Sequence, residues 1–223
     1  MKFLFVLLIM VSYLQCRAQV AQFAIWQPKE QNLQAFDAGY KKHLQWHKDN
    51  GDKWNWYGWY IISGNRVGQF IDATTGHAWA DLDKPINPAG DMQDNFINVF
   101  PYGNLNTVYK ASVIKELSAE RKELYTSRFI RMIRFTYNDP VAAKAYLLKF
   151  ISALKKQGFD QFVTYELCDG NAMELNVLVP FNSNEMLGKL LSAFKQVMMV
   201  SNLPFSTIQS ETWAYRSDLS LLN

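Results

Sequence analysis

The chain repeats one order of secondary-structure elements twice, and this repeat constrains its fold more than any other feature. The pattern strand, helix, strand, strand, helix, strand is predicted once between about Phe23 and Leu117 and again between about Ser127 and Leu222. Apolar residues at every third or fourth position indicate the helices, and alternating or aromatic and β-branched runs indicate the strands. The repeat therefore predicts two similar units.

Each predicted unit has one helix on either side of a hairpin. In the first unit, a helix over about 31–48 carries the apolar stripe that is typical of a helix lying on a sheet. Gly64-Asn65 predicts a hairpin turn, and Asp169-Gly170-Asn171 predicts its counterpart in the second unit. The other helices are expected from Pro88 or Asp91 to before Pro101, from Pro140 to about Gln157, and from Ser183 or Asn184 to about Val200.

Two βαββαβ units in one chain resemble the tandem form of the ferredoxin-like, dimeric α+β barrel superfamily. The resemblance implies an α+β fold in which two antiparallel sheets pack face to face as an intrachain pseudo-dimer. We expect a first unit over residues 19–117, a connector over 118–126 and a second unit over 127–223. Single-unit relatives pair two units by dimerising, and a tandem chain can form this pairing within itself. A monomer and a homodimer therefore both remain open.

What the resemblance implies about activity is broad. The superfamily includes small oxygenases, haem-degrading and haem-dependent enzymes, and ligand-binding proteins, so the fold alone does not choose a function. In the haem enzymes that the chain resembles, haem occupies the open face of a sheet. Histidines on the helices of this chain would lie on the other side of that sheet.

The N-terminus has the pattern of an export signal. Lys2 is followed by an apolar run over 3–14, which is too short to cross a bilayer as a helix. Cys16 and Ala18 stand three residues and one residue before an expected cut in front of Gln19. A lipoprotein cut before Cys16 is the alternative. We expect an exported protein, periplasmic or extracellular, with no membrane span.

Charge and cysteine content exclude some classes of partner. Loss of residues 1–18 removes Lys2 and Arg17, so the net charge falls from +3 to +1. A chain this close to neutral, with no basic run, is not expected to bind nucleic acid or an anionic membrane surface. Cys168 would then be the only cysteine, and we expect it to be a small buried residue on a strand rather than a nucleophile.

All three histidines fall in the first unit and suggest a metal site. His43 and His47 are four residues apart near the end of a predicted helix, so they share one face. The βαββαβ topology brings that helix end near the end of the third element, where His77 and Asp81 occur. These four residues, with Asp83 as an alternative carboxylate, could bind a divalent transition metal ion. His77, Asp81 and His47 are also the candidates for general acid or base catalysis.

A structural role for the histidines is the competing interpretation. Imidazoles near a helix C-terminus are favoured by the helix dipole, and a turn histidine commonly binds a nearby carboxylate. The segment from His43 to His47 also lacks the glutamate that follows the first histidine in a zinc protease helix. Nearby acidic residues match no calcium loop, and we expect Asp91 to cap its helix and Asp94 to lie in the first turn.

The run from Trp54 to Tyr60 predicts an aromatic-lined ligand site. On a strand, Trp54 and Trp56 face one side, whereas Tyr57 and Trp59 face the other. Gly58 leaves either a close backbone approach or a niche for a ligand. Aromatic walls of this kind bind small apolar or aromatic molecules, and they also form ordinary cores. In the second unit, Arg131 could hold an acidic group if it points between the sheets.

Three functions follow as hypotheses. The first is a small-molecule-binding or accessory module whose site comprises Trp54, Trp56, Tyr57, Trp59 and Arg131. The second is a metal-dependent or oxygenase-type enzyme, similar to the small monooxygenases of the superfamily. The third is a structural or interaction protein that binds no ligand. The contents of the space between the sheets distinguish them: a filled interior favours the third, a polar cavity favours binding, and an imidazole inside favours catalysis.

Overall fold

The computed structural model describes residues 19–199 and 202–223; the predicted leader and its alternative cleavage sites at Cys16 and Ala18 lie outside the described residues. The α+β fold class and the repeated element order are confirmed. The first unit contains β1 (Val20–Pro28), α1 (Leu33–Asp49), β2 (Tyr57–Ser63), β3 (Phe70–His77), α2 (Pro88–Asn98) and β4 (Gly103–Val113). The second contains β5 (Phe129–Tyr137), α3 (Pro140–Lys156), β6 (Val163–Leu167), β7 (Glu174–Phe181), α4 (Asn184–Met198) and β8 (Phe205–Tyr215).

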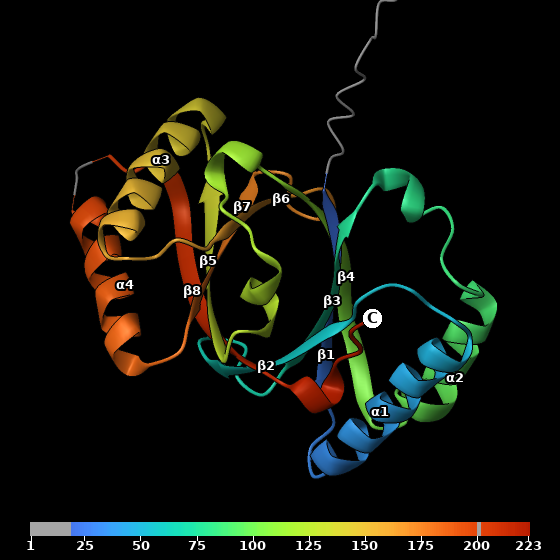
Figure 1. Ribbon diagram of the computed structural model, residues 1–223. Helices are drawn as coiled ribbons and strands as arrows, with labels where there is room; N and C mark the ends of the chain where they lie inside the picture. Colours follow the sequence, from blue (N-terminus) through green and yellow to red (C-terminus); the bar gives the residue numbers. More distant parts are fainter. Residues whose placement is uncertain (1–18, 200–201) are drawn as a thin grey trace, which may run out of the picture.

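The two antiparallel sheets close on each other to form one barrel. Within each unit the strand order is the ferredoxin-like one, β4-β1-β3-β2 and β6-β7-β5-β8. The edges also join, because β2 pairs with β8 at Trp59 and Tyr215, and β4 pairs with β6 at Ala111 and Leu167. Figure 1 shows the resulting ring of strands. A closed ring leaves no unpaired strand edge, which protects the sheet from pairing with other chains.

The barrel interior is filled by large side chains. Alternation along β2 places Tyr57, Trp59 and Ile61 on one face, as the sequence predicts. In the structure this face points into the barrel, where all three belong to one buried cluster with rings from both units. The connector between β4 and β5 turns inside the ring (Figure 1), where Leu124 and Tyr125 are buried. The backbone carbonyl of Tyr125 accepts a hydrogen bond from Trp59 Nε1 at 3.2 Å. The interior is therefore a core that the connector completes. A filled interior favours a structural role for the space between the sheets, so any ligand or metal site lies outside it.

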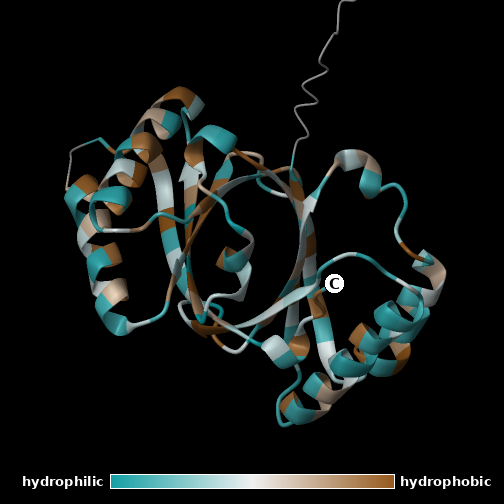
Figure 2. Ribbon diagram, viewed as in Figure 1, coloured by the Kyte–Doolittle hydropathy of each residue, from teal (hydrophilic) through white to brown (hydrophobic). Residues whose placement is uncertain are grey.

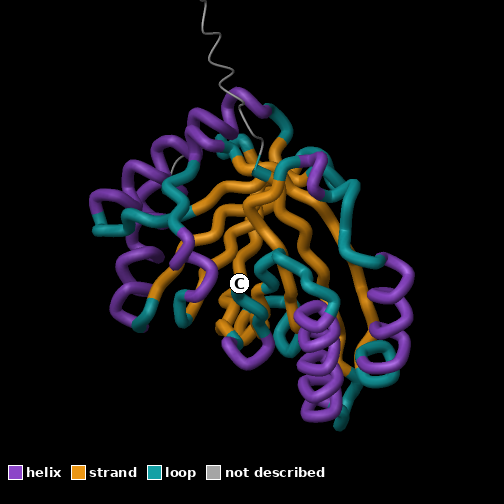
Figure 3. The backbone as a smooth tube through the Cα atoms, turned by 45° about the vertical axis from the view of Figure 1, so that its right-hand side comes forward, coloured by secondary structure: helices purple, strands orange, loops and turns teal. Residues whose placement is uncertain are grey.

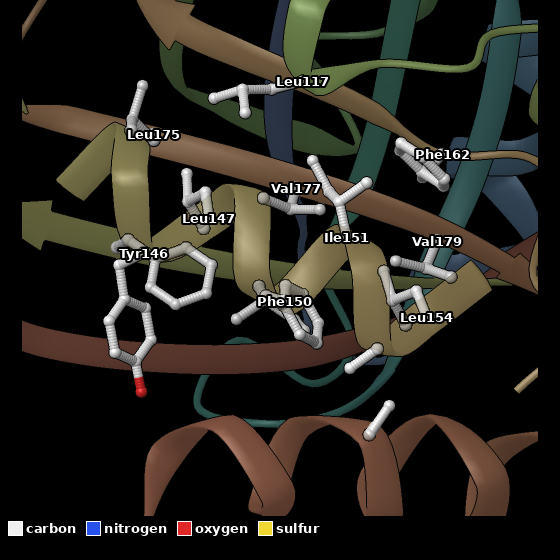
Figure 4. Close-up of a cluster of buried hydrophobic side chains, with 14 of the residues drawn as sticks. Leu117, Tyr146, Leu147, Phe150, Ile151, Leu154, Phe162, Leu175, Val177 and Val179 are labelled. Atoms are coloured by element: carbon white, nitrogen blue, oxygen red, sulfur yellow. The ribbon is translucent and has the colours of Figure 1, made fainter. Parts of the chain in front are cut away.

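The helices cover the outside of the barrel, in pairs (Figure 3). In the second unit, α3 directs apolar side chains such as Phe150 and Leu154 toward Val177 and Val179 on β7, which gives a dense core (Figure 4). In the first unit the helices are more hydrophilic (Figure 2), and α2 has no fully buried side chain. Within residues 19–199 and 202–223, no helix has the length and apolar composition needed to cross a bilayer.

Cys168 does not have its expected environment. The strand β6 ends at Leu167, one residue earlier than predicted, and Cys168 is exposed in the turn that follows. Its backbone N–H donates to the Lys110 carbonyl at 2.8 Å, which holds the turn against β4. The prediction of a buried cysteine was wrong because the chain leaves the sheet before this position.

The C-terminal segment after β8 crosses to the first unit and packs on Gly58. A Cβ atom at Gly58 would lie 2.3 Å from the Leu219 carbonyl oxygen, so this glycine permits a close backbone approach. Leu221 pairs with Trp56 through backbone hydrogen bonds of 2.8 Å in both directions. Of the two roles that the sequence leaves open for Gly58, the structure shows the close approach.

Gly58→Ala is expected to lower the free energy of unfolding by about 1–3 kcal/mol, because the added methyl group overlaps the backbone at Leu219. Chemical denaturation followed by circular dichroism measures this loss. Gly188→Ala on α4 is the matched control, since a Cβ there meets nothing within 4 Å and alanine is the better helix former. Equal stability of the Gly58→Ala protein and the wild type would contradict the close approach.

Candidate metal centre

The predicted ligand-binding residues lie on different surfaces of the barrel. Trp56 is on the helix-covered side of the first sheet, whereas Tyr57 and Trp59 are inside the barrel. Trp54 precedes β2, and its ring contacts the His77 ring at a tilt, with centroids 4.3 Å apart. Arg131 lies opposite Val179 and Thr212 on the helix side of the second sheet and donates to Thr212 Oγ1 at 3.0 Å. These five residues therefore do not form one site.

His43 and His47 are buried together on the face of α1 that turns toward the sheet and α2. Their Nε2 atoms are 3.2 Å apart, as the spacing of four residues on one helix face predicts. The helices α1 and α2 lie side by side (Figures 1 and 3), and Gly39 permits this, because a Cβ atom there would lie 1.8 Å from the Asn98 carbonyl oxygen. Close approach of the two helices brings Asp91 and Asp94 to the imidazoles.

Three donor atoms form a triangle that fits one metal ion. His43 Nε2 lies 3.3 Å from Asp91 Oδ1, and His47 Nε2 lies 3.8 Å from the same oxygen. The third side of the triangle, between the two Nε2 atoms, is 3.2 Å. A tetrahedral ion with ligands at about 2.0–2.1 Å holds neighbouring donor atoms about 3.3–3.4 Å apart. Among the described residues these three constitute the group whose donor atoms meet closely enough to share an ion.

Two further carboxylates orient the imidazoles. His43 Nδ1 lies 2.9 Å from Asp94 Oδ2, and His47 Nδ1 lies 2.8 Å from Asp52 Oδ2. Because an ionised carboxylate only accepts hydrogen bonds, each Nδ1 carries the hydrogen and each Nε2 keeps its lone pair. Asp52 Oδ2 also accepts from Trp56 Nε1 at 2.9 Å. A carboxylate behind each ligating imidazole is the usual arrangement around metal ions in proteins.

The electrostatic environment of the cluster keeps both imidazoles without a positive charge. Burial lowers the pKa of His43, although Asp94 opposes the change, and burial together with His43 lowers the pKa of His47. Both imidazoles are then neutral at pH 7, and their Nε2 lone pairs lie close together, with Asn95 Nδ2 also 3.3 Å from His43 Nε2 as a donor. Burial also raises the pKa of Asp91. A bound cation would relieve the repulsion between the lone pairs and pair with Asp91.

His77 and Asp81, two of the four predicted metal ligands, lie outside this triangle. His77 Nε2 is 2.5 Å from Thr74 Oγ1, so its hydrogen bond stays within the end of its own strand. Asp81 accepts from the backbone N–H of Ala78 at 2.8 Å and caps the short turn Trp79–Asp81. The sequence interpretation was correct that two histidines share a face, and the structure brings Asp91 rather than Asp81 beside them.

Asp91 was missed because the sequence interpretation gave it the role of helix cap, whereas α2 begins at Pro88, the earlier of the two predicted starts. The side chain of Asn87, rather than that of Asp91, caps α2 by accepting from the backbone N–H of Gly90 at 3.2 Å. Asp91 then lies one turn inside the helix, where its side chain reaches α1. The pair Asn87-Pro88 in the sequence indicates this cap, because proline is favoured directly after the cap residue.

Two cavities of about 200 Å³ each adjoin the triangle and share Gln22, His47, Trp56 and Asp91 as lining residues. One extends over the sheet to Asp72, and the other extends to the loop that contains Pro85. The coordination positions of a bound ion that no protein atom fills would therefore point toward space for a small molecule. This arrangement depends on the loose packing of α2, since the same layer of the second unit is filled by apolar side chains.

A larger cavity, of about 550 Å³, lies elsewhere. Its lining includes Tyr57, Glu120 and Tyr125 at a mouth of the barrel, and no imidazole. Tyr125 stacks obliquely on Tyr57 at 5.1 Å and hydrogen-bonds to Tyr165 at 2.5 Å, so its ring closes the way inward. His43 and His47 lie on the outer face of the sheet, and the interior is filled. The residues of the interior therefore do not fit a haem group.

Comparison with known proteins finds similarity at the level of fold. No family model and no curated protein sequence matches the chain. A putative monooxygenase from Lactobacillus acidophilus superimposes with a TM-score of 0.60 at 9% identity, over 92% of this chain and 96% of that chain. Chlorite dismutase from Candidatus Nitrospira defluvii gives 0.57 at 9% identity, over 88% and 91%.

An anthrone oxidase-like protein gives a TM-score of 0.52 at 9% identity, over 89% of this chain and 92% of that chain. Identities this low show a common fold and leave the reaction open. The agreement extends over nearly the whole of each chain, so it covers both units and the barrel between them. The chain has the fold of the dimeric α+β barrel proteins, in a tandem form.

Proposed function

We propose that the protein binds one divalent transition metal ion through His43 Nε2, His47 Nε2 and Asp91 Oδ1, and holds a small apolar or aromatic molecule beside it. The observation that carries the proposal is the triangle of donor atoms, with sides of 3.2, 3.3 and 3.8 Å. Support comes from the carboxylates behind both imidazoles and from the cavities that adjoin the triangle. Two imidazoles and a carboxylate suit Zn²⁺ or Fe²⁺.

A metal-dependent enzyme of oxygenase type is the second candidate. Two histidines and one carboxylate with open positions are the donor set of many non-haem iron oxygenases. The fold neighbours named as a monooxygenase and as an anthrone oxidase-like protein support this candidate through their fold alone. The cavities next to His47 and Asp91 would admit a substrate to the open positions.

We also propose that the protein acts after export, on the strength of the leader pattern over residues 1–18. The tandem repeat is compatible with a monomer or a homodimer. The binding proposal does not depend on the compartment. N-terminal sequencing of the protein from an exported fraction checks the leader directly, with Gln19 as the expected first residue.

Calorimetric titration of metal-free protein with Zn²⁺ tests the metal site. We expect one ion per chain for the wild type, and a loss of affinity of about 100-fold or more in His47→Ala, because a ligand is removed. His77→Ala is the matched control, since it removes a neighbouring buried imidazole outside the triangle, and its affinity should stay within about threefold. A wild type that binds no zinc, or equal losses in both variants, would disprove the proposal.

A further inference from the structure

The cavity between the triangle and β3 has a buried carboxyl group that the metal site does not use. Asp72 lines this cavity together with His43, His47 and Asp91. Its side chain is on the helix-covered face of β3, because its neighbours Ile71 and Ala73 point into the barrel. The cavity therefore has a carboxyl group on one wall and the candidate metal ligands on another.

Asp72 is buried without a cation. It is 5% exposed, and within the part of the chain that the structure describes no ion pair includes it. Its Oδ2 accepts a hydrogen bond from Trp26 Nε1 at 2.7 Å, and the Tyr40 hydroxyl also donates a hydrogen bond to the carboxyl group. Burial of a carboxyl group is costly unless its oxygens are satisfied. Its position on a cavity wall gives a bound molecule access to this group.

The remaining walls suit a single aromatic ring. Most of this lining is apolar or aromatic, with Gln22 and Asn95 as its other polar side chains. The rings come from Trp26, Tyr40, Trp56 and Phe100, and Leu105 and Val108 add aliphatic surface. The cavity volume is about 200 Å³. An apolar protein cavity of about 150 Å³ is known to hold benzene, so this one has room for one substituted ring.

From size, apolar walls and one buried carboxyl group, we propose that the cavity binds a single-ring aromatic molecule whose hydroxyl group donates a hydrogen bond to Asp72. This deepens the proposed function, because it names the class of molecule that lies beside the metal site. Asp72 would select the ligand, because an apolar ring of the same size leaves the carboxyl group without the added hydrogen bond.

Phenol and toluene, which differ in a hydroxyl and a methyl group, are the probes. Binding to zinc-treated protein at pH 8 can be followed by the fluorescence of Trp26 and Trp56 in the cavity wall. The wild type should prefer phenol by about tenfold or more, which is the gain from a hydrogen bond to a charged group. In Asp72→Asn the preference should fall to within about threefold, because a neutral amide accepts more weakly. Leu105→Trp should abolish binding of both probes by filling the cavity.

Glu174→Gln is the control, because it neutralises a buried carboxyl group that does not line this cavity. No preference for phenol in the wild type, or an unchanged preference in Asp72→Asn, would overturn the inference. Zinc content measured in the same samples separates the two proposals. Zinc binding without the phenol preference refutes this inference alone, and the phenol preference without zinc refutes the metal site alone.

Discussion

Replacing Trp59 by alanine is expected to lower the free energy of unfolding by about 3–5 kcal/mol, the usual cost of removing a large aromatic side chain from a core. Trp59 is 0% exposed, and its ring packs against Tyr57 and Trp213 with centroids 5.9 and 5.7 Å away. Its Nε1 also holds the connector through the Tyr125 carbonyl. Alanine would leave a cavity that rings from both units surround, and the connector would lose an anchor.

Urea denaturation measures the loss, with Trp79→Ala as the matched control. Trp79 is 45% exposed, so its replacement should change stability by about 0.5 kcal/mol at most. The comparison also decides the role of Trp59, which the sequence leaves open between ligand wall and core. A Trp59→Ala protein as stable as the control would show that the barrel interior is not the core described above.

Asp72→Asn is expected to be more stable than the wild type above pH 7, by up to about 4 kcal/mol in the metal-free protein. Burial raises the pKa of Asp72 to about 7 in the folded state, and Trp26 on β1 and Tyr40 on α1 oppose the rise while Asp91 on α2 adds to it. In the unfolded chain the carboxyl group ionises near pH 3.9. A difference of about three pH units corresponds to about 4 kcal/mol.

The direction follows from which state holds the proton more tightly. Below about pH 4, Asp72 is protonated in both the folded and the unfolded state, so the wild type loses no stability through this group. Between about pH 4 and pH 7 the unfolded state ionises first, so wild-type stability falls relative to Asp72→Asn as the pH rises. Above pH 7 the difference is constant. Denaturation of both proteins at pH 4, 6 and 8 measures it, and a difference that is the same at all three pH values would refute the raised pKa.

Periodicity in the sequence predicted the parts of the fold that depend on local pattern. Alternation separated Trp56 from Tyr57 and Trp59, and a four-residue spacing placed His43 and His47 on one face. Both predictions need only the geometry of a single strand or helix. The repeated order of elements then predicted the α+β units, because a βαββαβ segment has few ways to cover its sheet.

The rest of the site depends on contacts between elements that no single segment encodes. Asp91 reaches the imidazoles only because α2 packs against α1 at Gly39, and Asp52 meets His47 through the turn after α1. The connector fills the barrel with Tyr125, whereas the sequence predicted only a connector between the two units. Such contacts follow from packing and cannot be derived from spacing alone.

The measurement that tests the metal site most directly is anomalous X-ray diffraction from crystals of the zinc-loaded protein. The proposed centre predicts one strong anomalous peak about 2.0–2.2 Å from His43 Nε2, His47 Nε2 and Asp91 Oδ1. No peak at that position, or a peak bound instead by His77 and Asp81, would contradict it.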